Sequence, residues 1–101
     1  MNSIEALVCF TDKAAKKFSF YKKVDLPPCL FLGMYLWLTV QSKKNSWERQ
    51  VFRFVVEGAH FFEEEQSLEV WINSDDTSGE KPIIDACRRS VDWKKDKKDL
   101  L

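Results

Sequence analysis

The chain has 101 residues, with 16 Lys and Arg against 16 Asp and Glu, one His and three Cys, and it is 45% hydrophobic and 14% aromatic. This length suits a single domain, residues 1–101, with one modest core, and the aromatic content excludes an intrinsically disordered chain. A formal net charge of zero excludes the overall basicity that drives sequence-independent nucleic-acid binding.

The first half of the chain predicts β-strands. Residues 4–10 alternate in hydrophobicity as a first strand, and residues 16–26 alternate more loosely as a half-exposed second strand. Pro27 and Pro28 must stop the second strand, because proline cannot donate a hydrogen bond to a sheet ladder. Residues 29–41 then form a nearly continuous apolar run, which is typical of a central strand buried on both faces.

The middle of the chain predicts two or three further strands. A polar turn leads into residues 47–57, which alternate as a fourth strand. Residues 59–62 and 68–72 are separated by a run of glutamates, and they are either one long bulged strand or two short strands. The strands together are expected to cover about residues 4–73.

The end of the chain predicts one helix. Pro82 stands where the first helical turn tolerates proline, and apolar residues follow it at spacings of three and four, so residues 81–93 predict an amphipathic helix. Residues 94–101 alternate in charge without an apolar period, which predicts a frayed tail. The predicted fold is α+β and mainly β, an antiparallel meander or half-barrel of five to six strands with one C-terminal helix over one face.

The sequence predicts a soluble cytoplasmic protein. Met1 and the residues after it form no basic leader, and the longest apolar run, residues 26–40, is interrupted and shorter than the ~20 residues of a membrane-spanning helix. Cys9, Cys29 and Cys87 are odd in number and widely spaced in apolar segments, which favours buried reduced thiols over disulfides.

Few residues point to catalysis. His60 is the only histidine, and its place in a strand-like segment favours a packed or hydrogen-bonded ring. Only Glu63 and Glu65 of the three consecutive glutamates could converge on a metal or act as an acid–base pair, and a solvated acidic edge fits them better. No C-x-x-C pair, G-x-G-x-x-G loop or Walker loop occurs. The sequence therefore predicts no enzyme, no metal and no cofactor.

Charge is segregated along the chain. Residues 1–55 carry a net charge of +5, residues 56–80 carry eight acidic side chains and no basic one, and residues 81–101 carry a net charge of +3. Strand geometry would gather several of the acidic side chains at one edge of the sheet. There they would either steer a basic partner or protect the edge from pairing with another chain.

The tryptophans add to this pattern, because four indoles exceed what so small a core normally hides. They form either an interface or a second hydrophobic layer. Trp71 lies between Val70 and Ile72, so it points outward on the acidic strand if those two face the core, as an interface anchor would. The candidate partner-binding residues are Glu63, Glu64, Glu65, Glu69, Trp71, Asp75 and Asp76.

The segment from Lys23 to Met34 joins a leading strand to Leu-Pro-Pro, an apolar pair and Gly-Met. It resembles a junction in small bacterial proteins, and by size and strand order the chain is similar to the immunity proteins encoded beside polymorphic toxins, such as those of contact-dependent growth inhibition. The resemblance implies a cytoplasmic antitoxin that binds one cognate toxin domain, often a nuclease, and covers its active site without catalysis. It assigns no binding residues, because such families share no fixed motif.

The charge pattern agrees with that resemblance. A nuclease needs a positively charged cleft to hold phosphates, so its inhibitor benefits from clustered carboxylates that imitate the nucleic-acid backbone. The predicted partner is therefore one basic protein, with Trp71 as the apolar anchor.

Other classes remain open. The first half of the chain could bind single-stranded nucleic acid by stacking beside a basic groove, although alternation favours Phe18 and Phe20 as core residues rather than stacking platforms. An enzyme with a cysteine nucleophile would show rapid thiol labelling, and an unpaired strand edge would allow a homodimer. The basic and aromatic residues of the nucleic-acid alternative are Lys13, Lys16, Lys17, Phe18, Phe20, Tyr21, Lys22, Lys23, Lys43 and Lys44.

Overall fold

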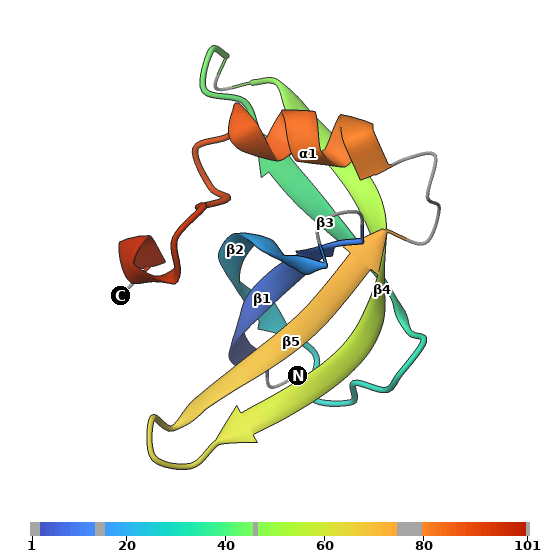
Figure 1. Cartoon of the computed structure of the whole chain (residues 1–101), viewed down its shortest axis with the longest axis vertical. Coiled ribbons are helices and arrows are strands. Elements are labelled where there is room, and N and C mark those ends of the chain that lie inside the picture. Colours follow the sequence, from blue (N-terminus) through green and yellow to red (C-terminus); the bar gives the residue numbers. More distant parts are fainter. Residues whose placement is uncertain (1–2, 14–15, 46, 75–79, 101) are drawn as a thin grey trace.

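The computed structural model describes residues 3–13, 16–45, 47–74 and 80–100. Within these ranges the chain forms one five-stranded sheet, one α-helix and one short 3-10 helix (Figure 1). In chain order the elements are β1 (Ile4–Asp12), β2 (Lys17–Leu26), β3 (Tyr35–Gln41), β4 (Arg49–Phe62), β5 (Ser67–Ser74), α1 (Glu80–Arg88) and η2 (Lys97–Leu100).

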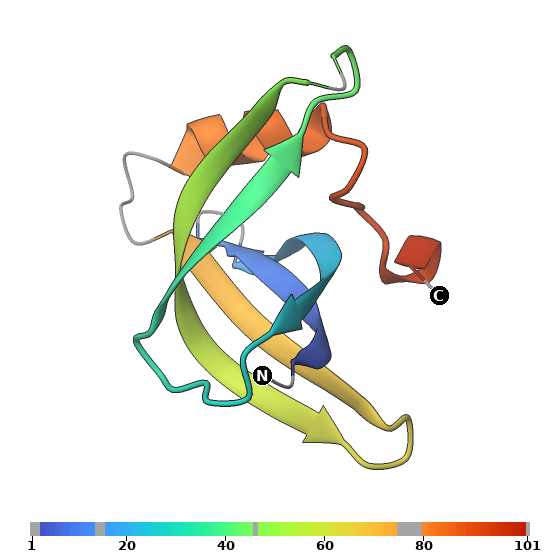
Figure 2. The ribbon, with the colours of Figure 1, turned by 180° about the vertical axis from the view of Figure 1, so that it is seen from behind.

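The sheet has the strand order β2-β1-β5-β4-β3 and curls into a half-barrel (Figures 1 and 2). The mainly β class and the half-barrel are thus confirmed. The expectation of an antiparallel meander is wrong in one pair, because β5 returns parallel to β1 and joins the hairpin β1–β2 to the meander β3–β4–β5. The sheet is therefore mixed.

The third predicted strand lies elsewhere than expected. Residues 29–34 are not part of a strand, and Gly33 takes a positive φ of 84° before β3 begins at Tyr35. β3 is an edge strand rather than a central one, and β5 is the central strand. The apolar run predicted burial on both faces, whereas one face of β3 carries large side chains that stay exposed.

The expected strands at 47–57 and 59–62 are one strand, β4. Its register with β5 shifts between Val56 and Gly58, so the bulge lies inside β4. A Cβ atom on Gly58 would lie 2.8 Å from Nε2 of His60, so any other residue there would require the imidazole ring to move. The predicted strand 68–72 lies within β5, after a turn in which Gln66 has a positive φ.

The core lies on the inner face of the half-barrel, under α1. Phe10 and Phe54 are fully buried and meet edge to face, with 5.7 Å between ring centroids. α1 adds Ile83 and Cys87 to this core, and Trp93 follows the helix with 3% of its surface exposed. The helix ends at Arg88, before the predicted residue 93, because the chain leaves it to pair with the sheet.

Residues 89–94, here named the clasp, close the opening between the two edge strands. On one side the backbone N–H of Val91 donates to Gln41 at the end of β3, at 3.0 Å. On the other side Lys94 and Tyr21 of β2 exchange two backbone hydrogen bonds of 2.7 and 2.8 Å. The clasp therefore bridges β3 to β2 where no ladder joins them.

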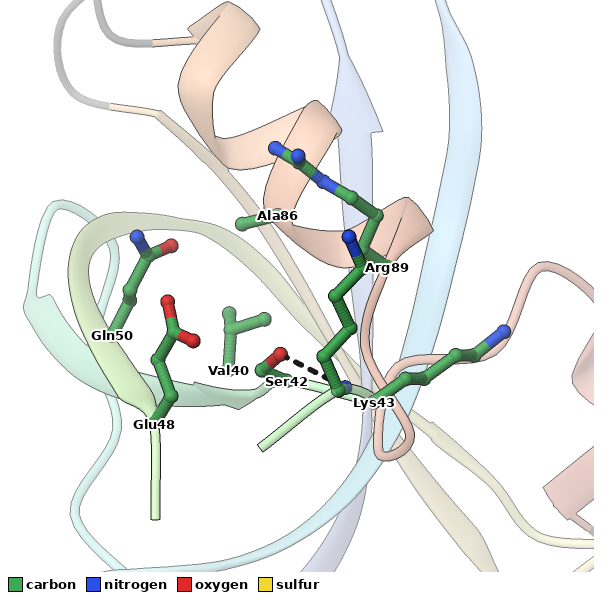
Figure 3. Close-up of a pocket in the computed structure, with 8 residues that line it drawn as sticks. Val40, Ser42, Lys43, Glu48, Gln50, Ala86 and Arg89 are labelled. Carbon is green, nitrogen blue, oxygen red and sulfur yellow. Dashed lines mark hydrogen bonds between the residues drawn. The ribbon is translucent and has the colours of Figure 1, made fainter. Parts of the chain in front are cut away.

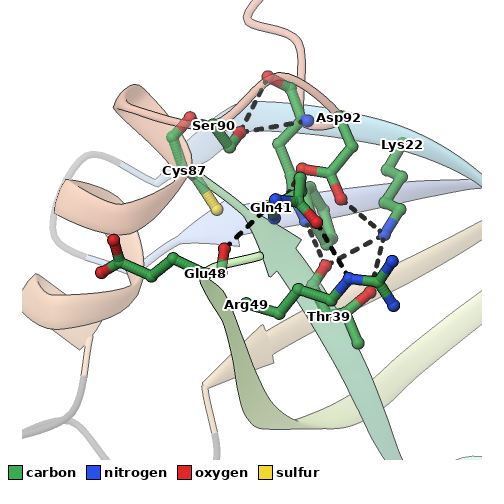
Figure 4. A network of polar contacts seen from close by, with 9 residues as sticks. Lys22, Thr39, Gln41, Glu48, Arg49, Cys87, Ser90 and Asp92 are labelled. Carbon is green, nitrogen blue, oxygen red and sulfur yellow. Dashed lines mark hydrogen bonds and ion pairs between the residues drawn. The ribbon is translucent and has the colours of Figure 1, made fainter. Parts of the chain in front are cut away.

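Side chains reinforce the clasp (Figure 4). The Asp92 carboxylate accepts a hydrogen bond from the Gln41 backbone N–H at 3.1 Å and pairs with the Lys22 ammonium at 3.0 Å. The backbone oxygen of Thr39 accepts from both Lys22 Nζ, at 2.9 Å, and Trp93 Nε1, at 3.0 Å. These contacts tie the β2 edge, the β3 edge and the segment after α1 together.

The frayed tail predicted for residues 94–101 is wrong over residues 94–100. Lys94 pairs with β2, and Lys97 in η2 forms an ion pair with Glu69 of β5, with Nζ 2.5 Å from the carboxylate oxygen. The alternation of charge in the sequence did not indicate that Lys97 would pair with the buried carboxylate of Glu69. No helix within the ranges described above is long and apolar enough to cross a membrane.

Candidate binding surface

The outer side of the β3–β4 hairpin carries an exposed cluster, here named the aromatic face, of Tyr35, Trp37, Val51 and Arg53. The exposed fractions of the three apolar side chains are 53%, 65% and 55%. Strand alternation produces this arrangement, because Leu36, Leu38 and Val40 point into the core and leave the odd-numbered side chains outside.

The Arg53 guanidinium organises the aromatic face. Its carbon lies 4.7 Å from the ring centroid of Tyr35 and 5.7 Å from that of Trp37, within the range of cation–π attraction. Trp37 and Arg53 are direct cross-strand partners. Within the two paired segments 35–41 and 49–55, the charged residues are Arg49 and Arg53, so this surface is positive.

Further apolar side chains lie close in sequence to the aromatic face. Phe31 and Leu32, in the connection that enters β3, are 65% and 70% exposed. Trp47, in the turn between β3 and β4, is 81% exposed. So much exposed apolar surface on one hairpin and its flanks is typical of an interaction site.

The acidic residues that were predicted to form one surface lie at separate places in the structure. Glu63, Glu64 and Glu65 lie exposed in the turn that joins β4 to β5, directly after Phe61 and Phe62, which are 62% and 40% exposed. These five residues are here named the acidic turn. Two further predicted residues, Asp75 and Asp76, lie outside the described residues.

Glu69 and Trp71 are not beside the acidic turn on an open surface. Trp71 does point away from Val70 and Ile72, as expected, but its indole is half-buried, at 5.2 Å from the ring of Phe18 and 3.8 Å from that of His60. Glu69 is only 7% exposed, and it accepts a hydrogen bond from Trp71 Nε1 at 3.3 Å. With Lys97 paired to it, Glu69 serves the fold of this chain.

A small buried cluster surrounds Glu69. The thiol of Cys9 lies 3.9 Å from the carboxylate. Burial first, and then the neighbouring charge of Glu69, raise the pKa of Cys9 to about 12. The hydrogen bond to Glu69 raises the pKa of Lys97, so that ammonium stays charged.

The cysteines differ in exposure. Cys9 and Cys87 are buried as expected, but Cys29 is exposed in the connection after β2, so the prediction of three buried thiols is wrong for Cys29. Burial, followed by the nearby Asp92 carboxylate, raises the pKa of Cys87 to about 12. Neither buried thiol is arranged as a nucleophile, because the thiolate is the reactive form.

We expect the native protein to consume one equivalent of a thiol reagent rapidly at pH 8, at Cys29. Three pKa units lower the thiolate fraction about 1,000-fold, and burial adds a steric barrier, so Cys9 and Cys87 should react far more slowly. Timed labelling followed by mass spectrometry measures this, and a Cys29→Ser variant is the control. Rapid native labelling of Cys87 in that variant would contradict the described burial.

His60 is packed against Trp71, in agreement with the prediction of a packed ring. No group of three His, Cys, Asp or Glu side chains within residues 3–13, 16–45, 47–74 and 80–100 is placed to hold a metal ion. Glu63 and Glu65, the remaining candidate pair, lie in an exposed turn.

The basic residues of the first half do not form one stacking platform. Phe20 is buried in the core as expected, at 3% exposure. Phe18 is not, because the register between β1 and β2 shifts between Phe10 and Thr11, and this turns its ring onto the outer face beside Trp71. Lys22 forms an ion pair with Asp92 of the clasp.

A hollow lies between the β3–β4 turn and α1 (Figure 3). It has a volume of about 490 Å³ and is lined by Lys43, Lys44 and Arg89 together with Glu48 and apolar side chains. The lysines are exposed. Glu48 lies among these three cationic side chains, and the hollow is open to solvent. They therefore do not form a defined anion-binding site.

Comparison with known proteins identifies no relative. The chain matches no protein-family model, no curated protein and no solved structure. The function must therefore be inferred from the residues of the chain itself.

Sequence reasoning missed the aromatic face. The apolar run of residues 29–41 predicts a strand buried on both faces, although Tyr35 and Trp37 alternate with Leu36 and Leu38. The sequence did contain a signal for this face. At the start of β3, aromatic side chains that carry polar groups alternate with purely aliphatic side chains.

Proposed function

We propose that this chain is a non-catalytic binding protein that recognises one protein partner through the aromatic face. The observation that carries this proposal is the exposure of Trp37 and Tyr35 on one strand, with the Arg53 guanidinium over both rings. Tryptophan, tyrosine and arginine are the residue types that most often dominate binding energy at protein interfaces.

The exposed apolar surface supports the same proposal. Burying apolar surface stabilises a complex by roughly 25 cal/mol per Å², so leaving a Trp and a Tyr in water on one strand has a cost that a partner removes. The side chains lie on a sheet rather than on a loop, so little conformational entropy is lost when they bind. The positive charge of Arg49 and Arg53 favours a partner with carboxylates opposite this face.

In the cell, this binding would inhibit a cognate toxin domain in the cytoplasm, as the resemblance to immunity proteins implies. The acidic turn supplies a second contact suited to a basic region of the partner, such as a nuclease cleft. Glu69 and Trp71 are left out of this interface, because both contribute to the buried cluster under η2. The partner is therefore expected to combine an acidic and a basic region.

We expect Trp37→Ala to weaken capture of the partner at least ~30-fold, because a truncated hot-spot residue typically loses 2 kcal/mol or more of binding free energy. The test is affinity capture from the native source at low and moderate salt, followed by titration of the recovered protein. Phe61→Ala is the companion variant that reports on the acidic turn, because Phe61 has nearly the same exposure as Trp37, 62% against 65%.

A loss with Phe61→Ala and none with Trp37→Ala would contradict the aromatic face and move the interface to the acidic turn. Charge reversal at Glu63, Glu64 and Glu65 then measures the second contact separately. Full capture by all of these variants would overturn the proposal.

Single-stranded nucleic acid is the second candidate, and the Arg53 guanidinium beside two exposed rings favours it. Bases stack on exposed aromatics beside positive charge, with a steep dependence on salt. Fluorescence anisotropy with short labelled oligonucleotides at ~50 and ~200 mM salt tests this alternative. Binding that falls steeply between these salts and disappears in Trp37→Ala would replace the protein partner by nucleic acid.

A further inference from the structure

The start of β3 is an open edge of the sheet. Even-numbered residues of β3 direct their backbone groups toward β4, as the bonds from Val56 N–H to Met34 and from Ser42 N–H to Glu48 at its two ends show. The backbone groups of the odd-numbered residues therefore point away from β4, because successive residues of a strand alternate between its two edges.

Only the second half of that outer edge is covered. Thr39 accepts hydrogen bonds from Lys22 and Trp93, and Gln41 is bonded to Val91 and Asp92. The backbone groups of Tyr35 and Trp37 have no hydrogen-bond partner among the described residues, and β3 is the last strand on its side of the sheet (Figure 2). The clasp therefore covers the end of β3 but does not reach Tyr35 and Trp37 at its start.

The open segment lacks the features that normally protect an edge. Native edges carry charged side chains, proline or bulges that prevent pairing with another chain. The other edge strand, β2, carries Lys23 and Asp25 beyond its contact with Lys94. By contrast, residues 35–37 are Tyr, Leu and Trp, with a regular register to β4 and no charge.

We propose that this edge pairs with the same edge of a second copy, to form a two-fold dimer with β3 antiparallel to β3. With the two-fold axis at Leu36, Tyr35 of one copy stands opposite Trp37 of the other. Each of these residues then exchanges both of its backbone hydrogen bonds across the axis. The segment is self-complementary, because the same two residues present donors and acceptors at equal distances from Leu36.

The side chains favour this pairing. Tyr35 and Trp37 lie on the outer face, so the dimer brings each tyrosine beside the tryptophan of the other copy, and aromatic cross-strand pairs stabilise sheets. The two β4 strands that carry Arg53 would be three strand spacings apart, about 14 Å. The outer faces of both hairpins would form one continuous aromatic surface.

The interface is small, so association is expected to be weak and concentration-dependent. An aromatic side chain buries at most about 150–250 Å², and pairing of the two edges covers only part of Tyr35 and Trp37 in each copy. A standard interface buries about 800 Å² per partner. We expect a shift from monomer to dimer between about 10 µM and 1 mM, rather than a permanent dimer.

Sedimentation velocity across this concentration range tests the proposal, with Tyr35→Pro compared to Tyr35→Ala. Both variants lack the phenol, but only the proline removes the outward N–H, and it leaves the bonds between β3 and β4 intact. Dimerisation should be at least about tenfold weaker in Tyr35→Pro than in Tyr35→Ala, since hydrogen bonds are lost on both sides of the axis. Circular dichroism checks that the two variants are equally folded.

Hydrogen exchange of the native protein provides an independent readout if Tyr35→Pro does not fold. The amides of Tyr35 and Trp37 should become protected as concentration rises, while those of Lys23 and Asp25 should not. A monomer at every concentration would overturn the proposal and leave the edge to a strand of another protein. A dimer without protection at these two amides would overturn it as well.

Discussion

Replacing Trp93 with alanine is expected to lower the free energy of unfolding by about 3–5 kcal/mol, the range for removal of a large buried aromatic side chain. The indole has 3% of its surface exposed, and its ring centroid lies 5.9 Å from that of Phe54 in the core. Its Nε1–H donates to the backbone oxygen of Thr39, so the variant loses both packing and a link of the clasp. Urea denaturation at neutral pH measures the effect.

Trp93→Phe is the informative control. Phenylalanine keeps most of the ring packing but lacks the N–H, and Thr39 still accepts from Lys22. A smaller loss of about 1–2 kcal/mol is therefore expected. Domains of this size have a free energy of unfolding of about 5–15 kcal/mol, so the alanine variant can be largely unfolded. In that case the effect is measured with the phenylalanine variant. A loss below about 1 kcal/mol in Trp93→Ala would show that the clasp does not depend on this residue.

The strands could be predicted from the sequence because their alternation is local. β1 and β2 lie within two residues of the predicted ranges, and the buried parity of β4 follows from Phe54 and Val56. Their order in the sheet could not be predicted, since the parallel pairing of β1 with β5 is a contact between distant segments. An apolar run of the β3 type also cannot tell a central strand from an edge strand that exposes aromatics.

The candidate site was mispredicted for the same reason. A count of charges along the chain placed Glu69 among the acidic interface residues, but its ion-pair partner, Lys97, lies 28 residues away in a segment without hydrophobic periodicity. Trp71 was correctly placed on the outer face by alternation, but its indole is covered by His60 and by Phe18, which the bulge between β1 and β2 turns outward. Long-range partners of charged and aromatic side chains decide which of them remain available to bind.

Raising the pH from 8 to 10.5 is expected to lower the free energy of unfolding by about 4 kcal/mol. Cys9 and Cys87 have pKa values of about 12 in the folded protein, against an ordinary value of 9.0 for the unfolded chain. Between these values the unfolded state releases protons that the folded state retains, so each thiol removes about 1.4 kcal/mol of stability per pH unit. The contribution of the thiols is fully present below pH 9 and is lost as the pH approaches 12.

Two further groups act in the same direction. Burial raises the pKa of Tyr21, and the hydrogen bond to Glu69 raises that of Lys97, so both hold their protons more tightly in the folded state than in the unfolded one. The stability that they contribute is likewise lost at alkaline pH. The alkaline limb of the stability profile therefore reports mainly on the two buried environments around Cys9 and Cys87, on opposite faces of the sheet.

Urea denaturation under reducing conditions at several pH values between 8 and 10.5 measures this dependence, and single cysteine variants divide it. Cys87→Ala should remove about half of the slope, at the cost of a small cavity beside α1 that lowers stability equally at every pH. Cys29→Ser is the matched control and should leave the slope unchanged, because that thiol is exposed. A slope that flattens in Cys29→Ser, or a native stability that is constant up to pH 10.5, would show that the buried thiols do not titrate as described.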